Sequence, residues 1–142
     1  MLHQAIEEGR VWALVAMALS LASRDEDPAT VGRLLAEAEA IARDDDRDTQ
    51  IEFLKAYELM IGDQSVQGAM RMRFKHMMAL AMHQPDPHFK LEVARGYGFG
   101  IGEDPPDVES ARRWYALAAE AGDPHAEPEL ASLEARWRLL GV

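Results

Sequence analysis

The chain of 142 residues contains no cysteine. This absence excludes disulfide scaffolds, thiolate metal sites and thiol nucleophiles. Basic residues are also few: 15 lysines and arginines stand against 25 aspartates and glutamates, which gives a formal net charge of −10. Because contacts between basic side chains and phosphates dominate nucleic-acid affinity, we expect no nucleic-acid partner. With 48% hydrophobic residues, the chain is nonetheless apolar enough to fold as one domain.

Long hydrophobic segments are missing as well. The longest apolar run covers 11–22, which is shorter than the roughly 20 residues that cross a bilayer. Glu7 and Glu8 precede this run, whereas a secretory leader begins with a positively charged region. We therefore expect no membrane insertion, no cleaved leader and a cytoplasmic location.

No segment shows the alternation of apolar and polar residues that marks a half-buried β-strand. Good helix formers dominate, and clusters of Asp with Gly, Pro, Ser or Thr interrupt them at regular intervals. Pro follows Asp27, Asp86 and Asp123, as it does in the first turn of many helices. The sequence therefore predicts an all-α fold. The expected helices cover 3–23, 28–43, 49–61, 65–82, 87–98, 107–121 and 124–139.

The odd-numbered members of this helix series repeat a residue pair whose second member is alanine. The alanines are separated by 38, 38 and 37 residues and are Ala18, Ala56, Ala94 and Ala131. Asp48, Asp86 and Asp123 open three of these helices at the same steps. Such a period predicts an array of α/α repeats. We expect a single domain over 1–142, with repeats near 10–47, 48–85 and 86–122 and a C-terminal capping helix over 123–142.

Residues 89–126 carry the densest version of the repeat. Its small residues, spaced glycines and aromatic pair are Val93, Ala94, Tyr97, Gly100, Gly102, Asp107, Ala111, Trp114, Tyr115, Ala118, Ala119, Glu120 and Gly122. This pattern closely resembles the Sel-one-like repeat, a relative of the tetratricopeptide repeat. Two departures are Ser110, where the family pattern has Lys, and a loop lengthened by Pro105 and Pro106.

The resemblance implies both a fold and a function. The fold is a right-handed α/α superhelical solenoid of about three Sel-one-like helix pairs plus a C-terminal helix. The function is that of a non-catalytic adaptor or scaffold, as in bacterial signalling, secretion and envelope assembly. Stacked helix pairs support this expectation because they expose an extended concave surface that can hold a partner protein or peptide.

Two patterns that could carry chemistry have simpler explanations. The glycine-rich stretch 96–102 could cradle a phosphate, but no strand precedes it, so we expect a turn between helices. His76, His83 and His88 lie among methionines, as in copper sites. Their spacing of seven and five residues does not place them on one helical face, which favours packing or a partner groove over a metal. We expect no cofactor and no catalytic set, with a carboxylate-dependent hydrolase as the weakest alternative.

Charge is unevenly distributed in this acidic chain. Residues 67–95 have a local excess of three positive charges, because two acidic residues, Asp86 and Glu92, stand against five basic ones. The basic residues are Arg71, Arg73, Lys75, Lys90 and Arg95. The segment is either a patch for an acidic partner or an internal offset of the acidic flanks.

The period also selects candidate binding residues along the odd-numbered helices. The resemblance to the Sel-one-like repeat implies that Val15, Phe53 and Leu91 lie in the core, because the family tends to be apolar at these positions. An exposed ladder that binds the partner is then formed by Trp12, Leu19, Tyr57, His88 and Arg95.

The first helix is apolar on both sides. The period assigns Ala13, Met17 and Leu21, with Ala18, to the core, which leaves Trp12, Val15 and Leu19 on another apolar side. This second side predicts a binding surface or a homodimer through the first helix, unless residues 1–9 fold over it. A different interaction class, a stoichiometric inhibitor or immunity protein of a toxin or effector, also fits a small acidic chain.

Overall fold

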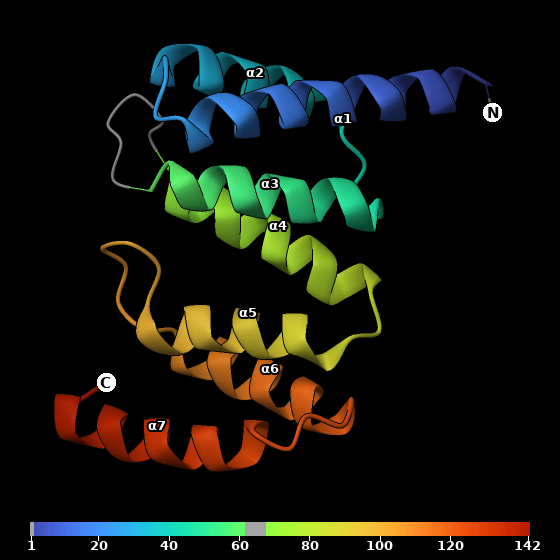
Figure 1. Cartoon of the computed structure of the whole chain (residues 1–142). Coiled ribbons are helices and arrows are strands. Elements are labelled where there is room, and N and C mark those ends of the chain that lie inside the picture. Colours follow the sequence, from blue (N-terminus) through green and yellow to red (C-terminus); the bar gives the residue numbers. More distant parts are fainter. Residues whose placement is uncertain (1, 62–67) are drawn as a thin grey trace. The chain divides into compact units, whose positions relative to one another are not determined.

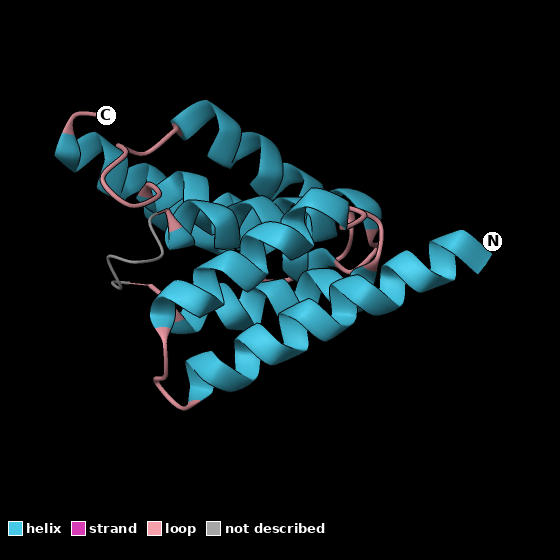
Figure 2. Cartoon of the chain, turned by 90° about the horizontal axis from the view of Figure 1, so that it is seen from above, coloured by secondary structure: helices cyan, strands magenta, loops and turns pink. Residues whose placement is uncertain are grey.

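The computed structural model describes residues 2–61 and 68–142, which form helices joined by short loops (Figures 1 and 2). Within these ranges there are seven α-helices and no strand, so the predicted all-α class is confirmed. The helices are α1 (Leu2–Ser23), α2 (Pro28–Ile41), α3 (Arg47–Leu59), α4 (Ala69–His83), α5 (Pro87–Phe99), α6 (Val108–Glu120) and α7 (Ala126–Leu140).

The helix ends lie within two residues of their predicted positions, with one exception. The predicted start of the fourth helix, at residue 65, lies outside the described residues. Agreement elsewhere has a local cause, because aspartate side chains cap the helices. Asp27 accepts from the Thr30 N–H of α2 at 3.3 Å, and Asp107 accepts from the Ser110 N–H of α6 at 3.1 Å.

Two of the predicted helix starts are wrong in detail. Asp46, not Asp48, caps α3, since its side chain accepts from the Thr49 N–H at 3.4 Å. Asp48 lies in the first turn, where a negative charge still stabilises the helix end. Asp123 accepts from the His125 N–H at 2.8 Å, so it caps a turn that precedes α7 instead of capping the helix.

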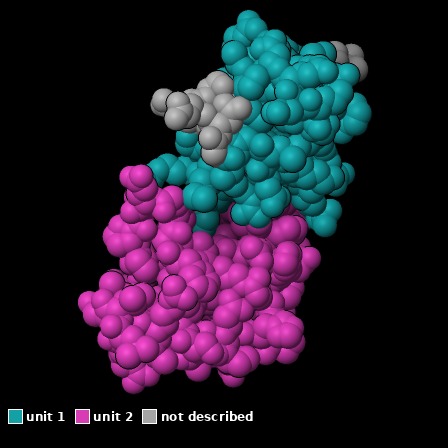
Figure 3. Space-filling model, turned by 60° about the vertical axis from the view of Figure 1, so that its left-hand side comes forward, with its two compact units in different colours: residues 1–76 teal, residues 77–142 magenta. Residues whose placement is uncertain are grey.

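The chain divides into two compact units (Figure 3), which we name unit 1 (residues 1–76) and unit 2 (residues 77–142). The division falls inside α4, so unit 1 contains α1, α2, α3 and the first part of α4. The remainder of α4 with α5, α6 and α7 makes unit 2. The repeats expected at 10–47, 48–85 and 86–122 stay a prediction. No helix of the described part is long and apolar enough to cross a membrane.

The core of unit 1 lies between α1, α2 and α3. Val15 of α1, Val31 of α2 and Phe53 of α3 are fully buried in it. The predicted core positions of Val15 and Phe53 are thus confirmed. The predicted core face of α1 is right only in part: Ala18 is fully buried and Leu21 is half-buried against the core, but Ala13 is exposed and the Met17 side chain is 56% exposed. The helix packs through Val11, Val15 and Ala18.

The core of unit 2 lies between α5, α6 and α7. Leu91 is buried there, as predicted, beside Tyr115 and Trp137. The Trp137 indole N–H donates to the Gly98 carbonyl at 2.9 Å, which ties α7 to α5.

The repeated alanines occupy close contacts in three of their four positions. Ala18, Ala56 and Ala94 are fully buried. Ala131, in the last helix, is exposed. A small side chain at the first three positions allows neighbouring helices to approach closely.

Candidate functional site

The five predicted ladder residues lie in very different environments. Trp12 is 57% exposed and His88 is also exposed, whereas Leu19 and Arg95 are half-buried. Tyr57 is only 4% exposed, so its predicted place on the surface is wrong. Trp12, Leu19 and Tyr57 belong to unit 1, and His88 and Arg95 belong to unit 2.

Tyr57 is buried because its ring packs inside unit 1. It stacks on the Phe53 ring, with centroids 6.1 Å apart, and on the His76 ring at 5.7 Å. Burial, with the charge of Glu39 nearby, raises the pKa of Tyr57 well above its usual range. The hydroxyl therefore stays protonated at any physiological pH, and the side chain serves packing.

His76 is the centre of a buried polar cluster that sequence reasoning missed. Its ring is sandwiched against Phe53, with centroids 4.2 Å apart, while its Nδ1 contacts the Gln50 Oε1 and its Nε2 contacts the Glu39 carboxylate. The Gln50 Nε2 donates to the Arg43 carbonyl at 2.9 Å, which fixes the orientation of the amide. Each ring nitrogen thus faces a side-chain oxygen, of Gln50 on one side and of Glu39 on the other.

Glu39 completes this cluster. Its second oxygen accepts from the Lys75 Nζ at 2.8 Å. Burial would raise the pKa of Glu39, but the hydrogen bonds from His76 and Lys75 outweigh burial and hold it below its usual range. The side chain of His76 is 2% exposed, so the cluster joins α2, α3 and α4 without opening to a substrate. The sequence signal that could have indicated this cluster is Glu39, a glutamate among the apolar residues of α2.

Arg95 is held by a second polar network, in unit 2. Its Nε and Nη2 donate to the two oxygens of Glu129 at 2.7 and 2.9 Å, and its Nη1 donates to Glu92 at 2.6 Å. The Tyr115 hydroxyl also donates to Glu129, at 2.8 Å. Arg95 holds the pKa of Glu129 below its usual range. The guanidinium thus has a fixed orientation, while its side chain stays 39% exposed.

Several basic side chains of the segment 67–95 are paired with groups inside their own unit. Lys75 pairs with Glu39, and Arg95 pairs with Glu92 and Glu129. The Lys90 Nζ donates to the carbonyls of Ala81 and Gln84 at 3.0 and 3.1 Å, where it caps the end of α4. At these three positions the charge offsets acidic groups and helix ends.

The glycine-rich stretch 96–102 is a turn only in its second half, because residues 96–99 still belong to α5 and the loop begins at Gly100. Gly100 has a φ of +87°, and a Cβ at this position would lie 2.2 Å from the Asp104 carbonyl oxygen. The Asp107 N–H donates to the Tyr97 carbonyl at 2.9 Å and draws the end of the loop back to α5. Only glycine fits this close approach of backbone to backbone.

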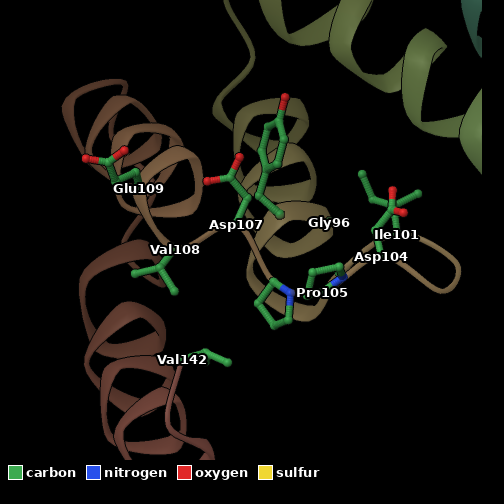
Figure 4. A pocket seen from close by; sticks show the side chains of 11 residues that line it. Gly96, Ile101, Asp104, Pro105, Asp107, Val108, Glu109 and Val142 are labelled. Carbon is green, nitrogen blue, oxygen red and sulfur yellow. The ribbon is translucent and has the colours of Figure 1, made fainter.

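This loop borders a pocket of about 570 Å³ in unit 2 (Figure 4). Its apolar walls come from α5, the loop and the start of α6, and from Val142 after α7. The side chains of Asp104, Asp107 and Glu109 also line it, and none of its lining residues is basic. A pocket of this charge does not cradle a phosphate.

The three histidines do not form a common site. His76 is buried, whereas His83 and His88 are exposed. Among the described residues, no three His, Asp or Glu side chains come together in a way that could hold a metal ion.

Comparison of the chain with protein-family models, with curated proteins and with solved structures finds no match. The resemblance to the Sel-one-like repeat therefore rests on residues 89–126 alone.

Proposed function

We propose that the chain is a non-catalytic protein-interaction module, an α/α superhelical solenoid of Sel-one-like type that binds a partner protein or peptide in the cytoplasm. The observation that carries the proposal is the composition of α1. Val11, Val15 and Ala18 of α1 lie in the core of unit 1, yet Trp12 and Met17 of the same helix are 57% and 56% exposed. A helix that is apolar on all sides is usually buried on all sides, so the outer face lacks a partner.

Trp12 suits such a surface. Tryptophan is enriched among the interface residues whose truncation costs the most binding free energy, because it buries a large rigid area. Leu19 lies nearby on α1, half-buried and packed at the edge of the core. Of the predicted ladder residues in unit 1, Trp12 and Leu19 thus remain as partner-binding residues, because Tyr57 is buried.

Unit 2 adds polar recognition through α5. His88 is exposed in its first turn, and Arg95 lies two turns later with its orientation fixed by Glu92 and Glu129. A side chain that is already ordered loses little conformational entropy on binding. We therefore keep His88 and Arg95 as the partner-binding residues of unit 2.

The proposal is tested by capture from a lysate of the source organism with the full chain as bait. The variants are Trp12→Ala, Met17→Ala, His88→Ala and Arg95→Ala, and the matched control is Leu139→Ala, which also removes an exposed apolar side chain. We expect at least one protein that the wild type and the control retain and the other variants lose. If every captured protein is retained by all correctly folded variants, the proposed surface is wrong. A tight one-to-one complex would place the chain among stoichiometric inhibitors.

The outer face of α1 also suits a second copy of the chain. Four small residues form its centre, Gly9, Ala13, Ala16 and Ser20. Gly9 and Ser20 lie equally far from the midpoint between Leu14 and Val15, and the same holds for Ala13 and Ala16 and for Trp12 and Met17. In an antiparallel two-fold interface each residue i meets residue j of the other copy and the reverse, so these pairs would lie level with each other.

Two antiparallel copies of α1 would therefore place each Ala13 opposite Ala16, with both Trp12 rings on one edge and both Met17 side chains on the other. Because the chain has no cysteine, a single introduced thiol reports this geometry directly. We expect covalent dimers from Trp12→Cys and from Met17→Cys with a short bifunctional maleimide, and none from Met82→Cys, which is 67% exposed in the native chain. A monomer by light scattering, with no preferential crosslinking, would leave this face to a different protein.

A further inference from the structure

We infer that the pocket beside the glycine-rich loop of unit 2 binds an arginine side chain from an exposed segment of a partner protein. The inference rests on the proposed function as a protein-interaction module and names the chemistry of the partner. It concerns residues other than Trp12, Met17, His88 and Arg95.

The size and walls of the pocket suit a long side chain. At about 570 Å³ the pocket lies within the range of ligand-binding clefts. Tyr97 of α5 and Pro106 of the loop provide apolar surface. Ile101 and Pro105 of the loop and Val108 at the start of α6 continue it (Figure 4). An aliphatic stem with a flat end group would bury apolar area against these walls.

The charge of the pocket selects a cation. Asp104, Asp107 and Glu109 line it, without a basic lining residue. Hydrogen bonds from the Ser110 N–H and hydroxyl, at 3.1 and 2.8 Å, lower the pKa of Asp107 and keep it ionised at neutral pH. The charge of Arg113 also lowers the pKa of Asp107, and it is the smallest of the causes that act on this carboxyl. A phosphate or an acidic peptide would be repelled.

Among cations, the apolar walls favour a guanidinium. Arginine is weakly hydrated and stacks on aromatic rings, whereas an ammonium group is compact and strongly hydrated. A metal ion would need several converging oxygen ligands, and no such group of three carboxylates or histidines occurs in the described part of the chain. The pocket thus combines apolar walls, to which Tyr97 contributes, with a negative rim, which matches both halves of an arginine side chain.

The pocket is also formed in advance of binding. Gly100 packs against the Asp104 carbonyl, the Asp104 N–H donates to the Ile101 carbonyl at 3.0 Å, and the Asp107 N–H donates to Tyr97. These contacts hold the loop in one conformation, which lowers the entropic cost of binding.

The test uses the full chain labelled with ¹⁵N and a short peptide of glycines and serines with one central arginine. Two matched peptides carry lysine or uncharged citrulline at the same place. We expect the arginine peptide to shift the amide signals of residues 96–109, the lysine peptide to bind more weakly, and the citrulline peptide to leave the signals unchanged. Raising the salt concentration should weaken binding, because exposed charges are screened.

Variants then connect binding to the pocket. Glu109→Gln should weaken binding of the arginine peptide about fivefold, and Ile101→Arg should abolish it by placing a guanidinium in the pocket. The control Glu127→Gln removes an exposed glutamate of α7 that does not line this pocket and should change nothing.

The inference is overturned if the arginine peptide shifts no signal in 96–109, if the citrulline peptide binds equally well, or if Glu109→Gln has no effect on a folded chain. Such results would leave the proposed function intact, because the capture experiment depends on residues outside the pocket. Failure of the capture experiment alone would refute the ladder residues and would not alter the peptide titration.

Discussion

The backbone conformation requires glycine at position 100 but not at position 9. Gly100 adopts a φ of +87°, and an added Cβ would lie 2.2 Å from the Asp104 carbonyl oxygen. We expect Gly100→Ala to lower the free energy of unfolding by about 1–3 kcal/mol, because both the conformation and the contact become strained. Chemical denaturation followed by circular dichroism measures the change.

The matched control for this substitution is Gly9→Ala. Gly9 lies inside α1, and an added Cβ would meet no atom within 4 Å. Alanine should therefore raise stability by about 0.5–1 kcal/mol, since it restricts the unfolded chain and favours helix. A Gly100→Ala variant as stable as the wild type would show that the loop relaxes without cost.

Glu129 should make unit 2 sensitive to acid. Arg95 holds its pKa below the usual range, against the opposing effect of burial, and Tyr115 adds a hydrogen bond. A carboxyl whose pKa is lower in the folded chain than in the unfolded chain stabilises the fold above the unfolded pKa, about 4.3 for glutamate. That stabilisation is lost as the pH falls through the folded pKa.

We therefore expect Glu129→Gln to be less stable than the wild type at pH 7, with a difference that shrinks between about pH 5 and pH 3. Thermal unfolding at a series of pH values measures both curves. Glu103→Gln, at an exposed position in the loop after α5, serves as the control and should show no comparable pH-dependent difference from the wild type. A stability difference that does not change with pH would mean that Glu129 contributes through packing alone.

At the scale of the element, substitutions in α1 should affect stability strongly at its packing residues and weakly at its proposed binding residues. Val15 is fully buried and Trp12 is 57% exposed on the same helix. We expect Val15→Ala to lower the free energy of unfolding by about 2 kcal/mol, through lost burial and a residual cavity. Trp12→Ala should change it by less than about 0.5 kcal/mol. Urea denaturation of both variants gives the comparison, and an equal loss in the two would show that Trp12 is covered in solution.

Local sequence predicted the helices well but did not settle which aspartate opens α3. Several aspartates precede this helix, and each is a good cap by type. The choice of Asp46 accompanies the burial of Gln50, whose side chain reaches the Arg43 carbonyl and the His76 ring. Because His76 comes from another helix, the pattern around α3 alone could not show this.

For the whole molecule, the division into two compact units predicts separate responses to core substitutions. Phe53→Leu disturbs the core of unit 1, and Trp137→Phe removes the hydrogen bond to Gly98 in unit 2. We expect each to cost about 1–2 kcal/mol. Amide hydrogen exchange should rise mainly in α1, α2 and α3 for the first variant and in α5, α6 and α7 for the second.

The same exchange experiment can contradict this expectation. If either variant raises exchange equally in all described helices, the chain opens as one cooperative unit and the division has no energetic meaning. Unequal responses would agree with the local contacts of repeat proteins, in which each repeat interacts mainly with its neighbours.

Sequence alone was sufficient for the all-α class and for nearly all helix bounds, and the resemblance to the repeat pattern added the buried positions of Val15, Phe53 and Leu91. These features depend on residues close together in the chain: caps, helix propensities and a regular apolar spacing. The glycine-rich turn belongs to the same group, since its conformation is local.

Tertiary structure alone decided the burial of Tyr57, the outward face of α1 and the two polar networks around His76 and Arg95. Each of these depends on a partner from another helix: Glu39 reaches His76 across 37 positions, and Glu129 reaches Arg95 across 34. Apolar spacing shows that a helix has a packing face, but α1 is apolar on several sides. The neighbours that fold against it select the side that is buried, and so leave Trp12 and Met17 for a partner.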